Sequence, residues 1–187
     1  MRQPRIPGSE SKERVMSIRE EFCAAWRAGV ALDGILTRFV VETHSRASGC
    51  WQLEKGFLKL KGFGWASDMP NEVSQGFQNA TRRVSLDQMG LGIVKAAVTG
   101  KPAIGRRDAL ATGLDGSANW IAKFGANTSL AIPIRDFATN SVIGVLAVST
   151  AAFVEEGDAL WETLHALAND LGRATERIKH SNPPVVS

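Results

Sequence analysis

The sequence predicts an α+β domain built around one antiparallel sheet. Apolar residues recur with a helical period near both ends of the chain, and they alternate with a period of two in several segments between. With 187 residues, 44% of them apolar, the chain can bury one core but is too short for two full-sized domains. We therefore expect a single domain over residues 13–178, with a flexible arm at 1–12 and a flexible tail at 179–187.

Two helices are predicted at the N-terminal end. The first begins near Ser11, and the second extends over residues 32–40 and ends before a polar loop at 44–49. The first helix has an apolar stripe with members every three or four residues, which would face a partner element. This stripe consists of Val15, Ile18, Phe22 and Trp26.

The period changes from helical to two after this loop. Residues 50–54 alternate, and Gly56 separates them from residues 57–61. Glycine supplies the positive backbone angle that a tight hairpin needs, so these two segments are predicted to form an antiparallel pair. A loop around Pro70 then leads to a short strand at 82–86.

Short helices and turns are predicted in the middle of the chain. Residues 91–98 indicate a short helix that Gly100 ends. Residues 103–116 hold small and charged residues, from which only a short strand and a loop are expected. Ser117 or Asn119 is predicted to cap a second short helix.

The C-terminal part of the chain has the clearest pattern. Residues 130–134 alternate, 136–141 form a hairpin loop, and 142–148 are apolar on both faces, as expected for a central strand. Gly144 lets this strand pass close to a neighbour, and Pro133 is acceptable only at an edge or bulge. The spacing of the last apolar residues indicates a long helix that packs lengthwise against another helix. Its seam consists of Leu160, Leu164, Leu167, Leu171, Ala174 and Ile178.

Composition excludes several classes of function. Lys and Arg number 22 against 19 for Asp and Glu, and the basic pairs at 82–83 and 106–107 lack interleaved aromatic residues, so nucleic-acid binding is not expected. No apolar segment has the length of a membrane span or forms a secretory signal, so we expect a cytoplasmic protein. Cys23 and Cys50 form no CxxC, which predicts buried reduced thiols and no metal site.

Three segments, in this order, resemble the GAF domain family, and the resemblance covers roughly residues 31–178. Residues 91–102 resemble the family's G-x-x-x-x-A-x-x-T-G-x-P helix and turn. Residues 129–134 resemble its S-x-L-x-V-P-L strand, and residues 142–148 resemble the x-I-G-V-L-x-L strand that follows. Phe153 resembles the aromatic residue that commonly precedes the final helix.

The resemblance implies short helices on one face of the sheet and the N- and C-terminal helices packed on the other. It also implies a small-molecule pocket beneath the short helices and a homodimer formed by the terminal helices. The pocket residues expected on this basis are Trp65, Trp120, Phe124, Ser129 and Ala131. Ordinary core filling is the alternative for the aromatic residues, and it is favoured for Phe124 and Phe77. The residues expected in the dimer helices are Ile18, Phe22, Leu160, Leu164, Leu167 and Leu171.

The better-known GAF ligands and reactions are not expected. Residues 45–164 contain no histidine and only Cys50, whereas bilin attachment needs a thiol and methionine sulfoxide reduction depends on pocket cysteines. The histidines lie on or beside the terminal helices, which disfavours haem, and the Asn-Lys-Phe-Asp-Glu signature of cyclic-nucleotide binding is missing. No nucleophile–base pair or phosphate-binding glycine loop occurs. The sequence leaves open an acid–base site formed by two carboxylates from loop-like segments. The candidates are Asp68, Asp87, Asp108 and Asp115.

These expectations describe a non-catalytic sensor of an unidentified small molecule, whose ligand shifts the packing of its terminal helices. Because the chain stops at Ser187 without an effector, it would act through a separate signalling partner, or else be a piece of a longer protein. The first alternative is a ligand-free dimerisation scaffold. The second is an unfamiliar enzyme, which would need clustered ionisable groups. An open cavity lined by Trp65 or Trp120 would favour sensing, and a closed core would favour scaffolding.

Overall fold

The computed structural model describes residues 16–179, with side chains up to Thr175. Six strands form one sheet in the order β3-β2-β1-β6-β5-β4, and every neighbouring pair is antiparallel. The predicted arm at 1–12 lies outside the described residues, as does the predicted tail at 179–187 apart from its first residue. The strands are β1 (Ala47–Glu54), β2 (Phe57–Trp65), β3 (Arg83–Ser85), β4 (Ala103–Arg106), β5 (Thr128–Arg135) and β6 (Val142–Thr150).

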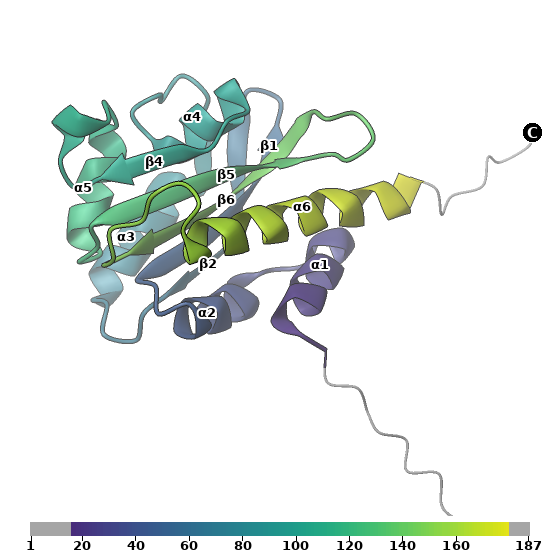
Figure 1. The fold of residues 1–187 in the computed structure, drawn as a ribbon, viewed down its shortest axis with the longest axis horizontal. Coiled ribbons are helices and arrows are strands. Elements are labelled where there is room, and N and C mark those ends of the chain that lie inside the picture. Colours follow the sequence, from purple (N-terminus) through teal and green to yellow (C-terminus); the bar gives the residue numbers. More distant parts are fainter. Residues whose placement is uncertain (1–15, 180–187) are drawn as a thin grey trace, which may run out of the picture.

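Helices cover both faces of the sheet (Figure 1). The terminal-helix face carries α1 (Ile18–Ala28), α2 (Asp33–Glu42) and the long α6 (Ala159–Lys179). The opposite face, which we call the cavity face, carries α3 (Asn71–Thr81), α4 (Gly92–Thr99) and α5 (Asp115–Lys123); a 3-10 turn, η1 (Ala109–Ala111), precedes α5. This arrangement confirms the predicted α+β fold class and the placement of the two sets of helices.

Local signals at the helix ends explain where α1 and α4 begin and end. The side chains of Ser17 and Glu20 form a capping box, so α1 begins at Ile18 instead of near Ser11 as predicted. Gly29 and Gly100 have positive φ angles of 69° and 65° and end α1 and α4. Glycine is favoured at both positions because other residues rarely adopt this conformation.

The predicted roles of two strand residues are confirmed. A Cβ at Gly144 would lie 2.5 Å from the carbonyl oxygen of Trp51 and 3.0 Å from the ring of Trp26, so a larger residue would not fit between them. Pro133 lies on β5 beyond the end of β4, whose pairing with β5 stops at Ala131. No β4 residue therefore lies opposite Pro133, where its missing N–H would be needed.

Both strands of the first hairpin are longer than predicted. β1 begins at Ala47, inside the segment 44–49 that is predicted as a loop. Its small residues there pair with β6 on one side and β2 on the other, and this pairing gives them strand geometry without an alternating apolar pattern. β2 continues to Trp65, whereas the prediction ends it at Lys61.

Two predictions about the short helices are wrong. The loop predicted around Pro70 contains α3, whose buried residues are Ser74, Phe77 and Thr81, so it lacks the apolar stripe that would identify a helix. Ser117 and Asn119 both lie within α5, so neither caps it. Instead the Ser117 hydroxyl accepts a hydrogen bond from the amide of Gly92 at 2.8 Å, at the start of α4.

Up to Ala174, the apolar seam of α6 packs on the chain's own sheet as well as on α1, and not on one partner helix alone. Leu164, Leu167 and Leu171 are at most 1% exposed. A Cβ at Gly172 would overlap the carbonyl oxygen of Arg135, so the helix lies directly against the backbone of β5. The terminal-helix face is therefore closed by side chains of a single chain.

Polar contacts join α1 to the second half of α6. Arg19 pairs with Asp170, and the indole Nε1 of Trp26 donates a hydrogen bond to Thr175 Oγ1 at 3.0 Å. These contacts explain why the two terminal helices lie side by side in Figure 1.

Candidate functional site

Small residues form the centre of the cavity face. Ser129 of β5 pairs with Ser149 of β6, and β1 places Ala47 opposite Ser149. Side chains this short leave room above the sheet for groups from the helices. We call these residues the floor, and it consists of Ala47, Gly49, Ser129, Ala147 and Ser149.

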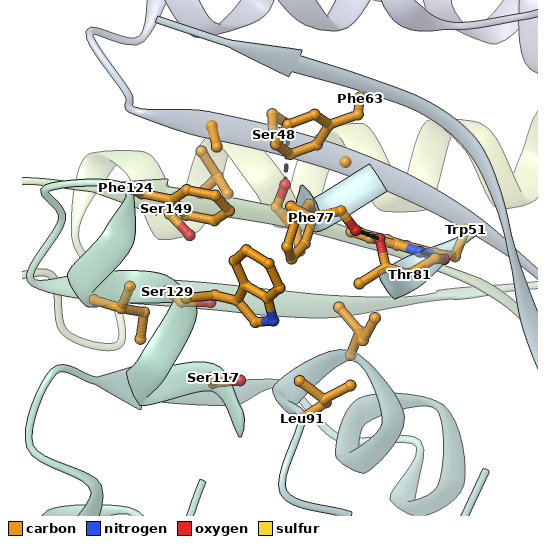
Figure 2. Close-up of a pocket in the computed structure, with 17 residues that line it drawn as sticks. Ser48, Trp51, Phe63, Phe77, Thr81, Leu91, Ser117, Phe124, Ser129 and Ser149 are labelled. Carbon is orange, nitrogen blue, oxygen red and sulfur yellow. Dashed lines mark hydrogen bonds between the residues drawn. The ribbon is translucent and has the colours of Figure 1, made fainter. Parts of the chain in front are cut away.

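Aromatic rings fill most of the room above the floor (Figure 2). The ring of Phe77 lies 4.8 Å from that of Phe63, 5.1 Å from that of Trp120 and 5.0 Å from that of Phe124, measured between centroids. Trp51 lies edge-on to Phe77 at 6.1 Å. Such pairs contribute about 0.5–1.5 kcal/mol each beyond the area they bury. We call these five residues the aromatic cluster; they come from β1, β2, α3, α5 and the residue that directly follows α5.

A cavity of about 40 Å³ remains between the floor and the aromatic cluster. This is enough for water, whereas sites for drug-sized ligands occupy about 300–1,000 Å³. None of the described residues that line the cavity carries a charge. The cavity is therefore small, apolar and uncharged.

Two floor hydroxyls, those of Ser129 and Ser149, have no hydrogen-bond partner among the described residues. The other hydroxyls of the lining are bonded to the backbone: Ser48 and Thr81 donate to carbonyls at 2.9 and 2.8 Å, and Ser117 accepts from an amide at 2.8 Å. Because Ser129 and Ser149 are directly paired across β5 and β6, they present two neighbouring polar groups in an apolar cavity.

Arg46 lies near the cavity and connects two of the elements around it. Its Nε donates to the carbonyl oxygen of Phe124 at the end of α5 (2.8 Å), and its Nη1 donates to Asp68 Oδ1 before α3 (2.7 Å). The hydrogen bond from Arg46 lowers the pKa of the exposed Asp68 carboxyl. This ion pair ties the loop before α3 to the end of α5.

No protein-family model and no curated protein matches the sequence. Solved structures do match, among them the GAF domain region of a protein from Geobacter sulfurreducens PCA, with a TM-score of 0.58 and 16% identity over 86% of this chain and 99% of that one. The chain has a GAF-like fold. This confirms the resemblance noted in the sequence.

Two further GAF-like structures show the range of proteins with this fold. One is the phycoerythrobilin-bound GAF domain from a cyanobacterial phytochrome, with a TM-score of 0.55 and 12% identity over 90% of this chain and 100% of that one. The other is fRMsr of Staphylococcus aureus in its reduced form, with a TM-score of 0.52 and 12% identity over 84% of this chain and 92% of that one. At these identities the likeness establishes the fold alone.

Three of the five pocket residues predicted from the GAF resemblance line the cavity: Trp120, Phe124 and Ser129. Trp65, near the end of β2, stacks on Phe63 at 5.6 Å but does not line the cavity. Ala131 is 1% exposed and lies under α4, outside the lining. Their binding roles stay predictions.

Several lining residues were not among those predicted, and Ser149 shows why. An unbroken hairpin with Arg135 opposite Val142 would place Val148 opposite Ser129. A register shift between Ile134 and Arg135 moves Ser149 into that position instead. No sequence signal located this shift. The other lining aromatics that the prediction left out are Trp51, Phe63 and Phe77.

Most of the side chains that were predicted to lie in the dimer helices are buried in the core of this chain. Phe22, Leu164, Leu167 and Leu171 are at most 1% exposed, and Ile18 and Leu160 are partly buried. These four buried side chains lie on no surface that a second copy could reach, because they pack between the sheet and the terminal helices. The homodimer itself stays a prediction, and it would have to use outward-facing residues of α1 and α6.

The described part of the chain offers few groups for metal or acid–base chemistry. Within it, no three His, Cys, Asp or Glu side chains gather in a way that could hold a metal ion. None of the four loop aspartates considered from the sequence lines the cavity. No helix between residues 16 and 179 is both long and apolar enough to cross a membrane.

The two cysteines are free thiols away from the cavity. Cys50 is fully buried on the terminal-helix face, and burial raises its pKa far above the usual range. Cys23 is only half-buried, so the prediction of a buried thiol is wrong for this residue; burial, followed by the charge of Asp170, raises its pKa. Thiols with raised pKa values are poor nucleophiles near neutral pH.

Proposed function

We propose that the chain is a small-molecule-sensing GAF domain whose ligand binds between the floor and the aromatic cluster. The observation that carries this proposal is the pair of hydroxyls of Ser129 and Ser149, which have no partner among the described residues. Both hydroxyls face the cavity and are accessible to solvent, so they are available to bond the polar group of a ligand between otherwise apolar walls.

The ligand is held without a covalent bond. A domain with the same fold, from a cyanobacterial phytochrome, is bound to phycoerythrobilin, which supports small-molecule binding by this fold. Covalent attachment of a chromophore would need a cavity thiol. Cys50 packs on the opposite face of the sheet, with its pKa raised by burial.

The site does not catalyse a reaction. Reduction of methionine sulfoxide, an activity of some GAF proteins, requires a thiolate that can attack the sulfoxide. Neither Cys23 nor Cys50 lines the cavity, and the described lining contains no ionisable side chain to serve as an acid or base.

The signal passes from the cavity to α6 through Arg135. The helix α4 lines the cavity with Ile93 and ends at Gly100, whose carbonyl oxygen accepts a hydrogen bond from Arg135. The backbone carbonyl of Arg135 lies against Gly172 of α6. A ligand that moves α4 would therefore change the packing of α6, because these contacts are contiguous.

The output of this movement is an altered contact along the outer face of α1 and α6. A groove between these helices is lined by both apolar and charged residues, including Met16, Cys23, Ala24, Arg173 and Ala174. In this proposal the groove forms a homodimer or binds a separate signalling protein in the cytoplasm.

A ligand-free scaffold is the second candidate function. The observation that favours it is the small volume of the cavity, about 40 Å³, because the chain's own rings fill the space that a ligand would need. In a scaffold, the two serine hydroxyls would bind water.

Native mass spectrometry of the freshly purified protein tests sensing against scaffolding. Ser129→Leu would fill the cavity, whereas Ser141→Leu, on the exposed hairpin loop, is a matched control. We expect the wild type and the control to retain a small molecule that the Ser129→Leu variant loses. If none is retained and no metabolite in a screen raises the melting temperature of the wild type, sensing is contradicted and the scaffold is favoured.

A further inference from the structure

A second hollow of about 240 Å³ lies next to the cavity. Thr81, Leu91 and Trp120 line both spaces, so the indole of Trp120 stands between them. None of the described residues around either space is charged. The outer hollow adds only the neutral amides of Gln88 and Asn119 to the polar groups within reach.

The indole of Trp120 is held by ring contacts alone. It packs edge-on against Phe77 at 5.1 Å, stacks on Phe124 at 6.0 Å, and has the ammonium group of Lys123 at 4.5 Å from its ring centre. Its Nε1 has no hydrogen-bond partner among the described residues. By contrast, Trp51 donates its Nε1 hydrogen to the carbonyl oxygen of Thr81.

The indole of Trp120 lies at the edge of the aromatic cluster, next to solvent and to a glycine. The side chain is partly exposed, and α3 presents Gly76 beside the ring, where a Cβ would lie 3.7 Å from the indole tip. Turning the indole out toward solvent would join the two hollows and add the volume of its own rings. The combined space then approaches the size of a small-ligand site, about 300 Å³.

We propose that Trp120 is an internal occupant of the ligand site, and that the ligand is an uncharged aromatic molecule of one or two rings, of the phenol or indole class, that displaces it. This inference rests on the proposed function. An aromatic ligand would replace the ring contacts that Trp120 gives up to Phe77 and Phe124. A cationic one would lose its hydration with no carboxylate in the lining to compensate, and an anionic one would meet only the solvent-exposed ammonium group of Lys123, which compensates little.

The hydroxyls of Ser129 and Ser149 define the polar end of this ligand. They lie on the floor, whereas Gln88 and Asn119 lie in the outer hollow beyond Trp120. A ring with one O–H or N–H group can bond to the floor hydroxyls while its apolar part lies against the aromatic cluster. This arrangement gives both floor hydroxyls a hydrogen-bond partner.

Calorimetric titration with indole tests the proposal on the full chain. Trp120→Ala removes the internal occupant, and we expect it to bind indole at least about tenfold more tightly than the wild type, because no side chain must first leave. Trp65→Ala is the matched control. Trp65 is also partly exposed and stacked on a phenylalanine but lies outside the cavity lining, so this variant should bind indole like the wild type. Benzoate, a charged ring, should bind Trp120→Ala at least about tenfold more weakly than indole.

Equal indole affinity of the wild type and Trp120→Ala would overturn the role of Trp120. Tighter binding of benzoate than of indole would overturn the ligand class. If Trp120→Ala does not fold, Trp120→Val carries the same expectation with a smaller loss of packing. If native mass spectrometry finds a charged or aliphatic ligand that Ser129→Leu loses, while indole fails to bind, the proposed function stands and this inference fails. If neither experiment detects a bound ligand, both the proposed function and this inference are contradicted.

Discussion

The two faces of the sheet bury their side chains in different ways. On the terminal-helix face, branched aliphatic residues such as Leu130, Ile132 and Leu146 form one buried cluster with Leu164 of α6, and all are at most 1% exposed. On the cavity face, large rings lie over alanine, glycine and serine, and a cavity remains. The first face has the close packing of a protein core, whereas the second is filled by aromatic rings that pack against one another. The comparison teaches that one layer is closed by packed aliphatic side chains, whereas the other leaves the space in which we propose that a ligand binds.

Adjacent residues of β5 provide the sharpest test, because their side chains point to opposite faces. Leu130→Ala should lower the free energy of unfolding by about 3 kcal/mol, since it leaves a hole in a packed aliphatic core. Ser129→Ala removes an unbonded hydroxyl and should change it by less than about 0.5 kcal/mol. Urea denaturation measures both values, and similar losses would contradict the comparison.

The contact between α6 and β5 should be nearly as sensitive. Gly172→Ala would drive a methyl group into the carbonyl oxygen of Arg135, so we expect a loss of about 2 kcal/mol in thermal or urea unfolding. Gly34→Ala is the control, because a Cβ on this α2 glycine meets nothing within 4 Å. It should leave stability unchanged or raise it. A tolerated Gly172→Ala would show that α6 can move away from the sheet.

Replacing two tryptophans on opposite faces of the sheet should give a smaller difference in the free energy of unfolding. Trp26→Phe loses the hydrogen bond to Thr175 and should cost about 1 kcal/mol more than Trp120→Phe, because the Trp120 indole nitrogen has no partner among the described residues. Parallel urea titrations of the two variants measure this difference. Equal costs would mean that the bond between α1 and α6 adds nothing to stability.

The smallest effect is expected from Asp68, which pairs with Arg46 near the cavity. Arg46 lowers the pKa of Asp68 in the folded state, so the stabilisation is present above the unfolded pKa of about 3.9 and is lost as the pH falls through the lowered folded value. Asp68→Asn should therefore melt slightly below the wild type at pH 7, and the difference should shrink below about pH 4. A difference that does not change with pH would contradict an ionic contribution.

The fold was predictable largely because the terminal-helix face and the central strands follow simple periodicity. Residues 142–148 are apolar on both faces, and the apolar seam of α6 repeats along the helix. Each of these elements can therefore be predicted from its own segment of sequence. The helix α3 does not, because two of its buried positions are Ser74 and Thr81, which bond to backbone carbonyls within the helix.

The site was harder to predict because it depends on register and on distant partners. Ser129 and Trp120 were identified by resemblance to a family, but the position of Ser149 opposite Ser129 depends on the register shift in β5. The prediction places Trp65 in the pocket, yet at the end of β2 this residue lies outside the cavity lining. Which small residues gather under which rings is a property of the assembled sheet and not of any single segment.

The outer strands of the sheet have a consequence for how copies of the chain meet. The edges are formed by β3 and β4, of three and four residues, whereas the four inner strands have eight or nine. Where β4 stops, Pro133 offers no N–H donor to an incoming strand. Short edge strands, one of them bordered by a proline, are poor templates for strand addition and for fibrils, so copies of this chain are not expected to join through their sheet edges.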